Sequence, residues 1–245
     1  MLKLIGSVSA AVLMVATLGV GEAAATPITI NNYSFESPVE SSSGSYSISN
    51  VTDWNYTAGA NASGTYPDGV FNVVNNNYPA GANGLSGGAL TPQGSQAAYL
   101  NGGGSLSQIT SAVFQDNATY TLTVYIGYRA DQNLPTSTSI GLEANGVLVT
   151  GGTLTFTAPA AGHWTEATYS FTTGSSDPLA GDTIGVILSS VASDSSEQAN
   201  FDDVALNYDA SSSVDAVPEP NSLALLGVGL LALVALGRRR RQPRG

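Results

Sequence analysis

The sequence predicts an all-β domain, an antiparallel β-sandwich or jelly roll, and three observations support this fold class. The middle of the chain is rich in Ser, Thr, Gly, Asn, Val and Tyr, which favour strands and turns over helices. Several short segments alternate apolar and polar residues with the two-residue period of a half-buried strand. Turn signals separate these segments at close spacing, as they do in sandwiches.

The clearest strand is expected over 119–129, because its apolar residues recur at every second position. Segments 139–144 and 147–150 are joined by Asn145-Gly146, a strong hairpin signal that favours a type I′ turn. The same reasoning predicts further strands at 28–31, 96–100, 105–110, 164–172, 183–190 and 200–207.

The segment 55–94 differs from the rest of the domain. It is rich in Gly, Asn, Pro and Tyr and has little periodicity. A structureless stretch of this length is unusual inside one domain. We therefore expect it to hold a few short strands, together with the loops that decide ligand contact.

The two chain ends carry sorting features that do not belong to the fold. Lys3, an apolar run and three small alanines before Thr26 predict a signal peptide. The expected organisation is a signal peptide over 1–25, a β-sandwich domain over 26–210, a polar linker over 211–216 and a C-terminal segment over 217–245.

The C-terminal segment has three parts with distinct physical properties. Pro218-Glu219-Pro220 keeps the backbone extended, because proline disfavours helix in the residues before it. The apolar stretch at about 222–237 can enter lipid as a helix whose backbone hydrogen bonds are satisfied internally. The basic tail 238–245 opens with four arginines, which hold their side of the membrane in the cytoplasm.

This tripartite arrangement resembles the PEP-CTERM sorting signal, with Pro218, Glu219 and Pro220 as the sorting motif. The resemblance implies transient membrane anchoring, processing by an exosortase-type protease, and release to the cell surface or the extracellular matrix. An ordinary C-terminal anchor is the alternative. A buried helix of a soluble domain would give no reason for four consecutive arginines.

The predicted mature body is strongly acidic. Residues 27–215 contain sixteen carboxylate side chains and one basic side chain, Arg129, so their formal charge is −15 with histidine neutral. Such a surface repels phosphate backbones, which argues against nucleic acid as a partner. Divalent cations are plausible partners, since carboxylates are ligands that Ca²⁺ prefers. The absence of cysteine excludes thiol chemistry and thiolate metal sites.

The body resembles the galactose-binding-like jelly roll of carbohydrate-binding modules over about 27–208. An Asn-x-x-Phe-Glu motif ends at Glu36, and Trp54 follows it. A segment with an early Trp and a late Phe lies at 163–172, and a Phe-Asp-Asp-Val-x-Leu sequence lies at 201–206. These features are typical of the opening, middle and closing strands of that family.

The resemblance also implies a structural Ca²⁺ where the first and last strands meet. Carried over to this sequence, Glu36 and Asp202 are the side-chain ligands, and backbone carbonyls supply the rest. The alternative is that Asp202 and Asp203 form a solvated pair at a strand edge while Glu36 caps a turn.

No catalytic residues are predicted. His163 is the only histidine, and a Gly-x-Ser-x-Gly elbow is absent from the sequence. No carboxylate pair has a spacing that marks a glycosidase. Most acidic residues are interpreted as solvated charges in loops, namely Asp53, Asp68, Asp116, Asp131, Asp177, Asp182 and Asp194.

Aromatic side chains are the best candidates for sugar contact, because flat rings stack on the apolar faces of pyranoses. Tyr66 and Tyr78 lie in the irregular segment and are expected to be exposed platforms, whereas Trp54 is expected to pack in the core. The candidates for carbohydrate binding are Tyr66, Tyr78, Tyr56 and Trp54.

Together these features predict an exported, non-catalytic protein of the cell surface or matrix that associates with exopolysaccharide. One alternative is a purely structural matrix protein that binds no sugar. Another is an enzyme that acts on polysaccharide, since an acidic pair could be assembled by the fold.

Overall fold

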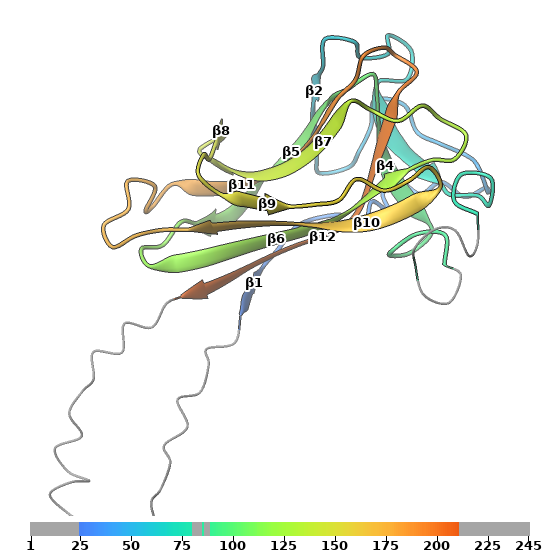
Figure 1. Cartoon of the computed structure of the whole chain (residues 1–245). Helices are drawn as coiled ribbons and strands as arrows, with labels where there is room; N and C mark the ends of the chain where they lie inside the picture. Colours follow the sequence, from blue (N-terminus) through green and yellow to red (C-terminus); the bar gives the residue numbers. More distant parts are fainter. Residues whose placement is uncertain (1–24, 80–84, 86–88, 211–245) are drawn as a thin grey trace, which may run out of the picture. The chain divides into compact units, whose positions relative to one another are not determined.

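The computed structural model describes residues 25–79, 85 and 89–210, and within them the chain forms two antiparallel sheets packed face to face (Figure 1). The larger sheet has the strand order β3-β4-β12-β6-β10-β9, with β1 pairing on β12 as its seventh strand among these residues. The smaller sheet has five described strands in the order β2-β5-β11-β7-β8. The predicted all-β antiparallel sandwich is thus confirmed.

The strands of the larger sheet are β1 (Thr26–Ile28), β3 (Asp68–Asn72), β4 (Gln96–Asn101), β6 (Ala118–Tyr128), β9 (Thr153–Thr155), β10 (His163–Thr172) and β12 (Gln198–Ala210). Those of the smaller sheet are β2 (Asn55–Ala58), β5 (Gly104–Val113), β7 (Ser137–Ala144), β8 (Val147–Leu148) and β11 (Thr183–Val191).

Strands with regular alternation were predicted correctly. In β6, the inward residues Tyr120, Leu122, Val124 and Ile126 are completely buried between the sheets. The β7–β8 hairpin turns at Asn145-Gly146, where both residues have the positive φ that a type I′ turn requires. The described residues of the segment 55–94 form two short strands, β2 and β3, whereas β9 was not expected from the sequence.

Two apolar clusters sit on opposite faces of the larger sheet. The main core lies between the sheets and includes Leu100, Leu188 and Phe201. A second cluster covers the outer face of the larger sheet and consists of Phe71, Val73, Tyr78, Ala97, Tyr99 and Trp164. The larger sheet is therefore apolar on both faces over its central part, so its outer face can pack against loops or a ligand.

The stretch before β2 borders the larger sheet at its β3 edge. The backbone N–H of Ser47 donates to the carbonyl of Val70 at 2.8 Å, and the N–H of Asn72 donates to the carbonyl of Ser45 at 2.8 Å. These bonds hold residues 44–50 alongside β3 and leave less of that edge unpaired.

No helix among the described residues is long and apolar enough to cross a membrane. The predicted signal peptide up to residue 24, the linker and the C-terminal segment lie outside the described residues.

Candidate functional site

A row of directly opposed residues crosses the outer face of the larger sheet. Gly69, Tyr99, Asn200, Gly127 and Trp164 are register partners on β3, β4, β12, β6 and β10. A Cβ atom on Gly69 would come within 2.8 Å of the Tyr99 ring, and one on Gly127 within 2.6 Å of the Trp164 ring. The two glycines therefore let the rings lie flat against the sheet.

Beside this row lies a pocket with a volume of about 400 Å³. This volume falls within the range of small-molecule sites. Its floor is formed by residues of β3, β4 and β12, and the rest of its lining comes from five loop segments. It is lined by Gly44, Tyr46, Ser63, Tyr66, Phe71, Val74, Asn76, Asn77, Tyr99, Asn101, Arg129, Asp131, Gln132, Ser195 and Gln198.

One wall of the pocket is aromatic. The rings of Tyr46 and Tyr66 meet edge to face with centroids 5.7 Å apart, and those of Phe71 and Tyr99 do so at 6.3 Å. Tyr46 and Tyr66 are 51% and 40% exposed, whereas Phe71 and Tyr99 are buried. The wall thus runs from exposed rings at the surface to buried rings at the sheet.

A second part of the pocket lining is built around Arg129, which follows directly after β6. Its Nε and Nη2 donate to the two carboxylate oxygens of Asp131 at 2.9 and 2.7 Å, a two-point ion pair. Its Nη1 donates to Oε1 of Gln198 at 3.3 Å. The guanidinium carbon lies 5.2 Å from the centre of the Phe71 ring, close enough for a cation–π contact.

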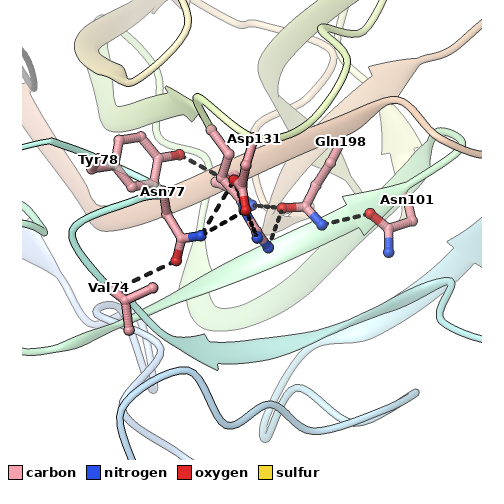
Figure 2. A network of polar contacts seen from close by, with 8 residues as sticks. Val74, Asn77, Tyr78, Asn101, Asp131 and Gln198 are labelled. Atoms are coloured by element: carbon pink, nitrogen blue, oxygen red, sulfur yellow. Dashed lines mark hydrogen bonds and ion pairs between the residues drawn. The ribbon is translucent and has the colours of Figure 1, made fainter.

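Amide side chains extend this ion pair into a network (Figure 2). Nδ2 of Asn77 donates to both oxygens of Asp131, and Oδ1 of Asn77 accepts the backbone N–H of Val74. Nε2 of Gln198 donates to Oδ1 of Asn101 at 2.6 Å. These bonds fix the orientation of each polar group before any ligand arrives.

The network continues beneath the pocket. Nδ2 of Asn200 donates to Gln198, and the hydroxyl of Tyr78 donates to Oδ1 of Asn200 at 2.7 Å. The Tyr78 ring stacks on Trp164 with centroids 4.5 Å apart. The indole N–H of Trp164 donates to the carbonyl of Leu90. The polar floor therefore rests on a packed aromatic pair.

The protonation states of the lining groups follow from these contacts. Burial alone would raise the pKa of Asp131, but the hydrogen bonds and charge of Arg129 outweigh it and hold that pKa below its usual value. Burial raises the pKa of Tyr99, and the hydrogen bond with Tyr66 raises the pKa of Tyr46. At neutral pH the pocket therefore presents an ionised carboxylate, a guanidinium and protonated phenols.

The structure brings one of the four predicted sugar-binding residues into this pocket, namely Tyr66. Tyr78 was expected to be exposed, but it is completely buried because its ring stacks on Trp164 and its hydroxyl donates a hydrogen bond to Asn200. Trp54 is buried against Phe35 with ring centroids 5.3 Å apart. Tyr56 lies on β2 of the smaller sheet, away from the pocket lining.

Sequence reasoning missed the polar half of the pocket. Asn77, Gln198 and Asp131 come from distant segments and carry no local motif. Arg129 could have been found, because it is the single basic residue in 27–215. A lone guanidinium in a strongly acidic chain is a signal in itself.

Glu36 and Asp202 lie apart from this pocket and anchor the start of β4. Oε1 of Glu36 accepts the backbone N–H groups of Ser95 and Gln96, both at 2.8 Å. Oδ2 of Asp202 accepts the N–H of Gln93 at 2.9 Å. Burial, with a contribution from the charge of Glu36, raises the pKa of Asp202 well above its usual value. No group of three or more His, Asp or Glu side chains placed to hold a metal occurs among the described residues.

The expectation that Asp68 is a solvated loop residue is wrong. Asp68 opens β3 and is 2% exposed, and its Oδ1 has no hydrogen-bond partner among the described residues. The hydroxyl of Tyr56 is also buried without a partner there. Burial raises the pKa of Asp68 to about 6.

Two family models match the chain. A model described as HpiC1 cyclase matches residues 26–207, which is the whole β-sandwich except its last residues. A model of the PEP-CTERM protein-sorting motif matches residues 216–241, so the recognition of the sorting signal is confirmed. No curated protein matches the chain.

Solved structures share the fold. A Stig cyclase from Fischerella sp. TAU, in complex with (3Z)-3-(1-methyl-2-pyrrolidinylidene)-3H-indole, has a TM-score of 0.62 and 22% identity, covering 76% of this chain and 98% of that one. A cyclase from the same organism in complex with 4-(1H-Indol-3-yl)butan-2-one has a TM-score of 0.60 and 22% identity, with 75% and 97% covered. At this identity the likeness shows a common fold.

Carbohydrate-binding modules with jelly-roll folds are also among the structural neighbours. A CBM61 module in complex with β-1,4-galactotriose has a TM-score of 0.39 and 13% identity, covering 73% of this chain and 97% of that one. The expectation of a non-catalytic protein is overturned by the match of most of the domain to a cyclase family.

Proposed function

The chain belongs to the HpiC1 cyclase family, and from this premise we propose that it is an exported cyclase that binds a small aromatic molecule in the pocket around Arg129. The observation that carries this proposal is a cavity of about 400 Å³ that is lined by four aromatic rings and by an ordered ion pair. The pocket thus combines apolar area for binding with a few fixed polar groups for orientation, as small-molecule sites do.

The aromatic wall fits a flat ring system. Edge-to-face or stacked ring pairs contribute about 0.5–1.5 kcal/mol beyond the area that they bury. The Fischerella cyclases with this fold are in complex with indole compounds. An indole ring in this pocket would meet the apolar surface of lining rings such as Tyr66 and Tyr99, so we take an indole-bearing molecule as the probe class.

The polar groups of the pocket would accelerate ring closure because their positions are fixed before the reaction. Ring closure moves charge along a carbon skeleton, and oriented dipoles and charges stabilise that charge without reorganising. The face of the Tyr99 ring favours developing positive charge, as cation–π contacts do. Asp131 is ionised and held by Arg129 and Asn77, so the ion pair presents charges of fixed position to the ligand.

Export is supported by the sorting motif at 216–241. We propose that an exosortase-type protease processes the chain near Pro218-Glu219-Pro220, after a transient anchoring by the apolar stretch 222–237. The mature protein would then act at the cell surface or outside it. A structural Ca²⁺ held by Glu36 and Asp202 remains part of this proposal, with backbone carbonyls as further ligands.

The test is calorimetric titration of the purified protein with 4-(1H-Indol-3-yl)butan-2-one. Tyr66→Ala removes an exposed ring of the pocket wall. Tyr33→Ala is the matched control, since Tyr33 is 42% exposed and lies outside the pocket lining. We expect Tyr66→Ala to weaken binding by about 2- to 10-fold and Tyr33→Ala to leave it unchanged. Equal affinities of all three proteins would show that the pocket is not the binding site.

A second candidate function is binding of exopolysaccharide at the same pocket. The favouring observation is that the exposed rings of Tyr46 and Tyr66 line the same pocket as the amides of Asn76 and Gln132. Rings with neighbouring amides suit sugars as well as aromatic ligands. Polysaccharide pull-down that is lost in Tyr66→Ala, together with no heat from the indole probe, would favour this function over the first.

A further inference from the structure

Arg129 is the one basic side chain of residues 27–215, a stretch with a formal charge of −15. Arg129 does not lie on the open surface as a counter-charge to the carboxylates. Its side chain is 18% exposed and forms part of the pocket wall. A guanidinium in such a place is suited to recognising one group of a ligand.

The hydrogen bonds of Arg129 leave part of its donor set free. A guanidinium side chain has five N–H donors. Three of them are used within the described residues, two by Asp131 and one by Gln198. One N–H on each terminal nitrogen is left for a ligand.

The carboxylate oxygens of Asp131, in contrast, already have their hydrogen-bond donors. Each of its carboxylate oxygens accepts from Arg129 and from Nδ2 of Asn77. A hydrogen-bond donor on a ligand would meet Asp131, whose oxygens each already accept two hydrogen bonds. A hydrogen-bond acceptor on a ligand would meet the two free N–H groups of Arg129.

We propose that Arg129 determines specificity by binding an uncharged oxygen acceptor, such as a carbonyl or hydroxyl oxygen, beside the aromatic part of the ligand. This inference rests on the proposed function and names a second feature of its ligand. Asp131 already neutralises Arg129, and a carboxylate on the ligand would stand close to Asp131 in a domain of strongly negative charge. Like charges at this distance repel, so the pocket disfavours an anion.

The network around Arg129 reduces the conformational entropy that is lost when the ligand binds. Gln198 is held by Asn101 and Asn200, and the guanidinium rests on the Phe71 ring. A side chain ordered before binding loses little conformational entropy when the ligand arrives. Arg129 is therefore a positioned donor rather than a flexible surface charge.

The test uses three probes that share the indole ring. They are 4-(1H-Indol-3-yl)butan-2-one, the butylindole in which a methylene replaces its ketone, and indolepropionate, in which a carboxylate replaces the methyl ketone. Each is titrated into the full protein, the Tyr66→Ala variant, and the double variant Arg129→Met with Asp131→Asn. The double variant keeps an unbranched apolar stem over Phe71 and removes both charges of the ion pair together.

The unaltered protein is expected to bind the ketone about 10-fold more tightly than butylindole, because a hydrogen bond to a charged donor is stronger than one between neutral groups. It is also expected to bind the ketone about 10-fold more tightly than indolepropionate. The double variant should bind the ketone and butylindole with equal affinity. Tyr66→Ala should weaken both to the same extent, since it removes ring contact only.

Equal binding of all probes to the unaltered protein would overturn the role of Arg129 while leaving the aromatic site intact. A ketone preference that survives in the double variant would do the same. Tighter binding of indolepropionate than of the ketone would overturn the preference for an uncharged acceptor. If none of the probes binds, the proposed function fails and this inference fails with it. The comparison of probes on the unaltered protein holds even if the double variant does not fold.

Discussion

Replacing Asp68 by Asn should stabilise the domain at neutral pH and leave it nearly unchanged in acid. Asp68 is 2% exposed, and one of its carboxylate oxygens has no partner among the described residues. No described basic side chain forms an ion pair with it. Its negative charge also raises the pKa of Tyr56, whose hydroxyl is buried and unpartnered in the same part of the structure. Ionised Asp68 is therefore a buried charge without compensation.

The magnitude follows from the pKa. Burial raises the pKa of Asp68 from 3.8 to about 6, a difference that corresponds to at most about 3 kcal/mol. The folded state binds the proton more tightly than the unfolded state. The stabilising contribution is therefore fully present below the unfolded pKa and is lost as the pH rises through about 6. We expect about 1–2 kcal/mol, since a carboxyl at a strand end can turn partly toward water.

The assay is thermal unfolding followed by circular dichroism at about pH 3, below the unfolded pKa, and at about pH 7.5. Asp68→Asn should raise Tm by roughly 3–6 °C at the higher pH for a domain of this size. Asp202 also has a raised pKa, but it is present in both proteins, so its titration cancels from the difference. Asp53→Asn is the control, because Asp53 is exposed. If Asp68→Asn were less stable than the unaltered protein only at the higher pH, the carboxylate would have a favourable partner and the reasoning would be refuted.

Three further outcomes are expected. Tyr78→Phe leaves Oδ1 of Asn200 buried without its donor and should lower the free energy of unfolding by about 1–3 kcal/mol; an unchanged urea midpoint would contradict this. Ca²⁺ should raise Tm and a chelator should lower it, but neither should act on Asp202→Asn; indifference of the unaltered protein to both would count against the site. Mass spectrometry of the exported protein should give ends at Thr26 and near Glu219, and trypsin should cut the unfolded mature chain at Arg129 alone; several tryptic fragments would disprove these ends.

The sequence predicted the strands that have one solvated face. In β6 and β10 the apolar residues alternate because one face packs on the core and the other on smaller or polar groups. In β3 four of the five residues are buried, since Val70 faces the core and Phe71 faces the pocket. A strand buried on both faces loses its two-residue period, which is why this segment read as irregular.

The candidate site depends on contacts that no local pattern encodes. Tyr66 and Tyr78 look alike in the sequence, yet one lines the pocket and the other is completely buried under it. The difference comes from Gly127 and Trp164, whose position beneath Tyr78 is set by strand register. Arg129 and Gln198 meet only because β6 and β12 pair side by side. Spacing along the chain gives no indication of such a meeting.

Strand β12 runs from the pocket to the opposite end of the domain, where it pairs with β1. Gln198 at its start belongs to the pocket, and its last residues pair with β1, where Thr26 lies opposite Tyr208 (Figure 1). Thirteen residues of extended chain span roughly 40 Å. A dye, a resin or a fusion partner attached at either end of the described domain would thus lie far from the pocket. Since Thr26 and Tyr208 are paired, a short peptide could also connect the two ends of the described domain, and a circularly permuted domain opened at Asn145-Gly146 would keep its pocket whole.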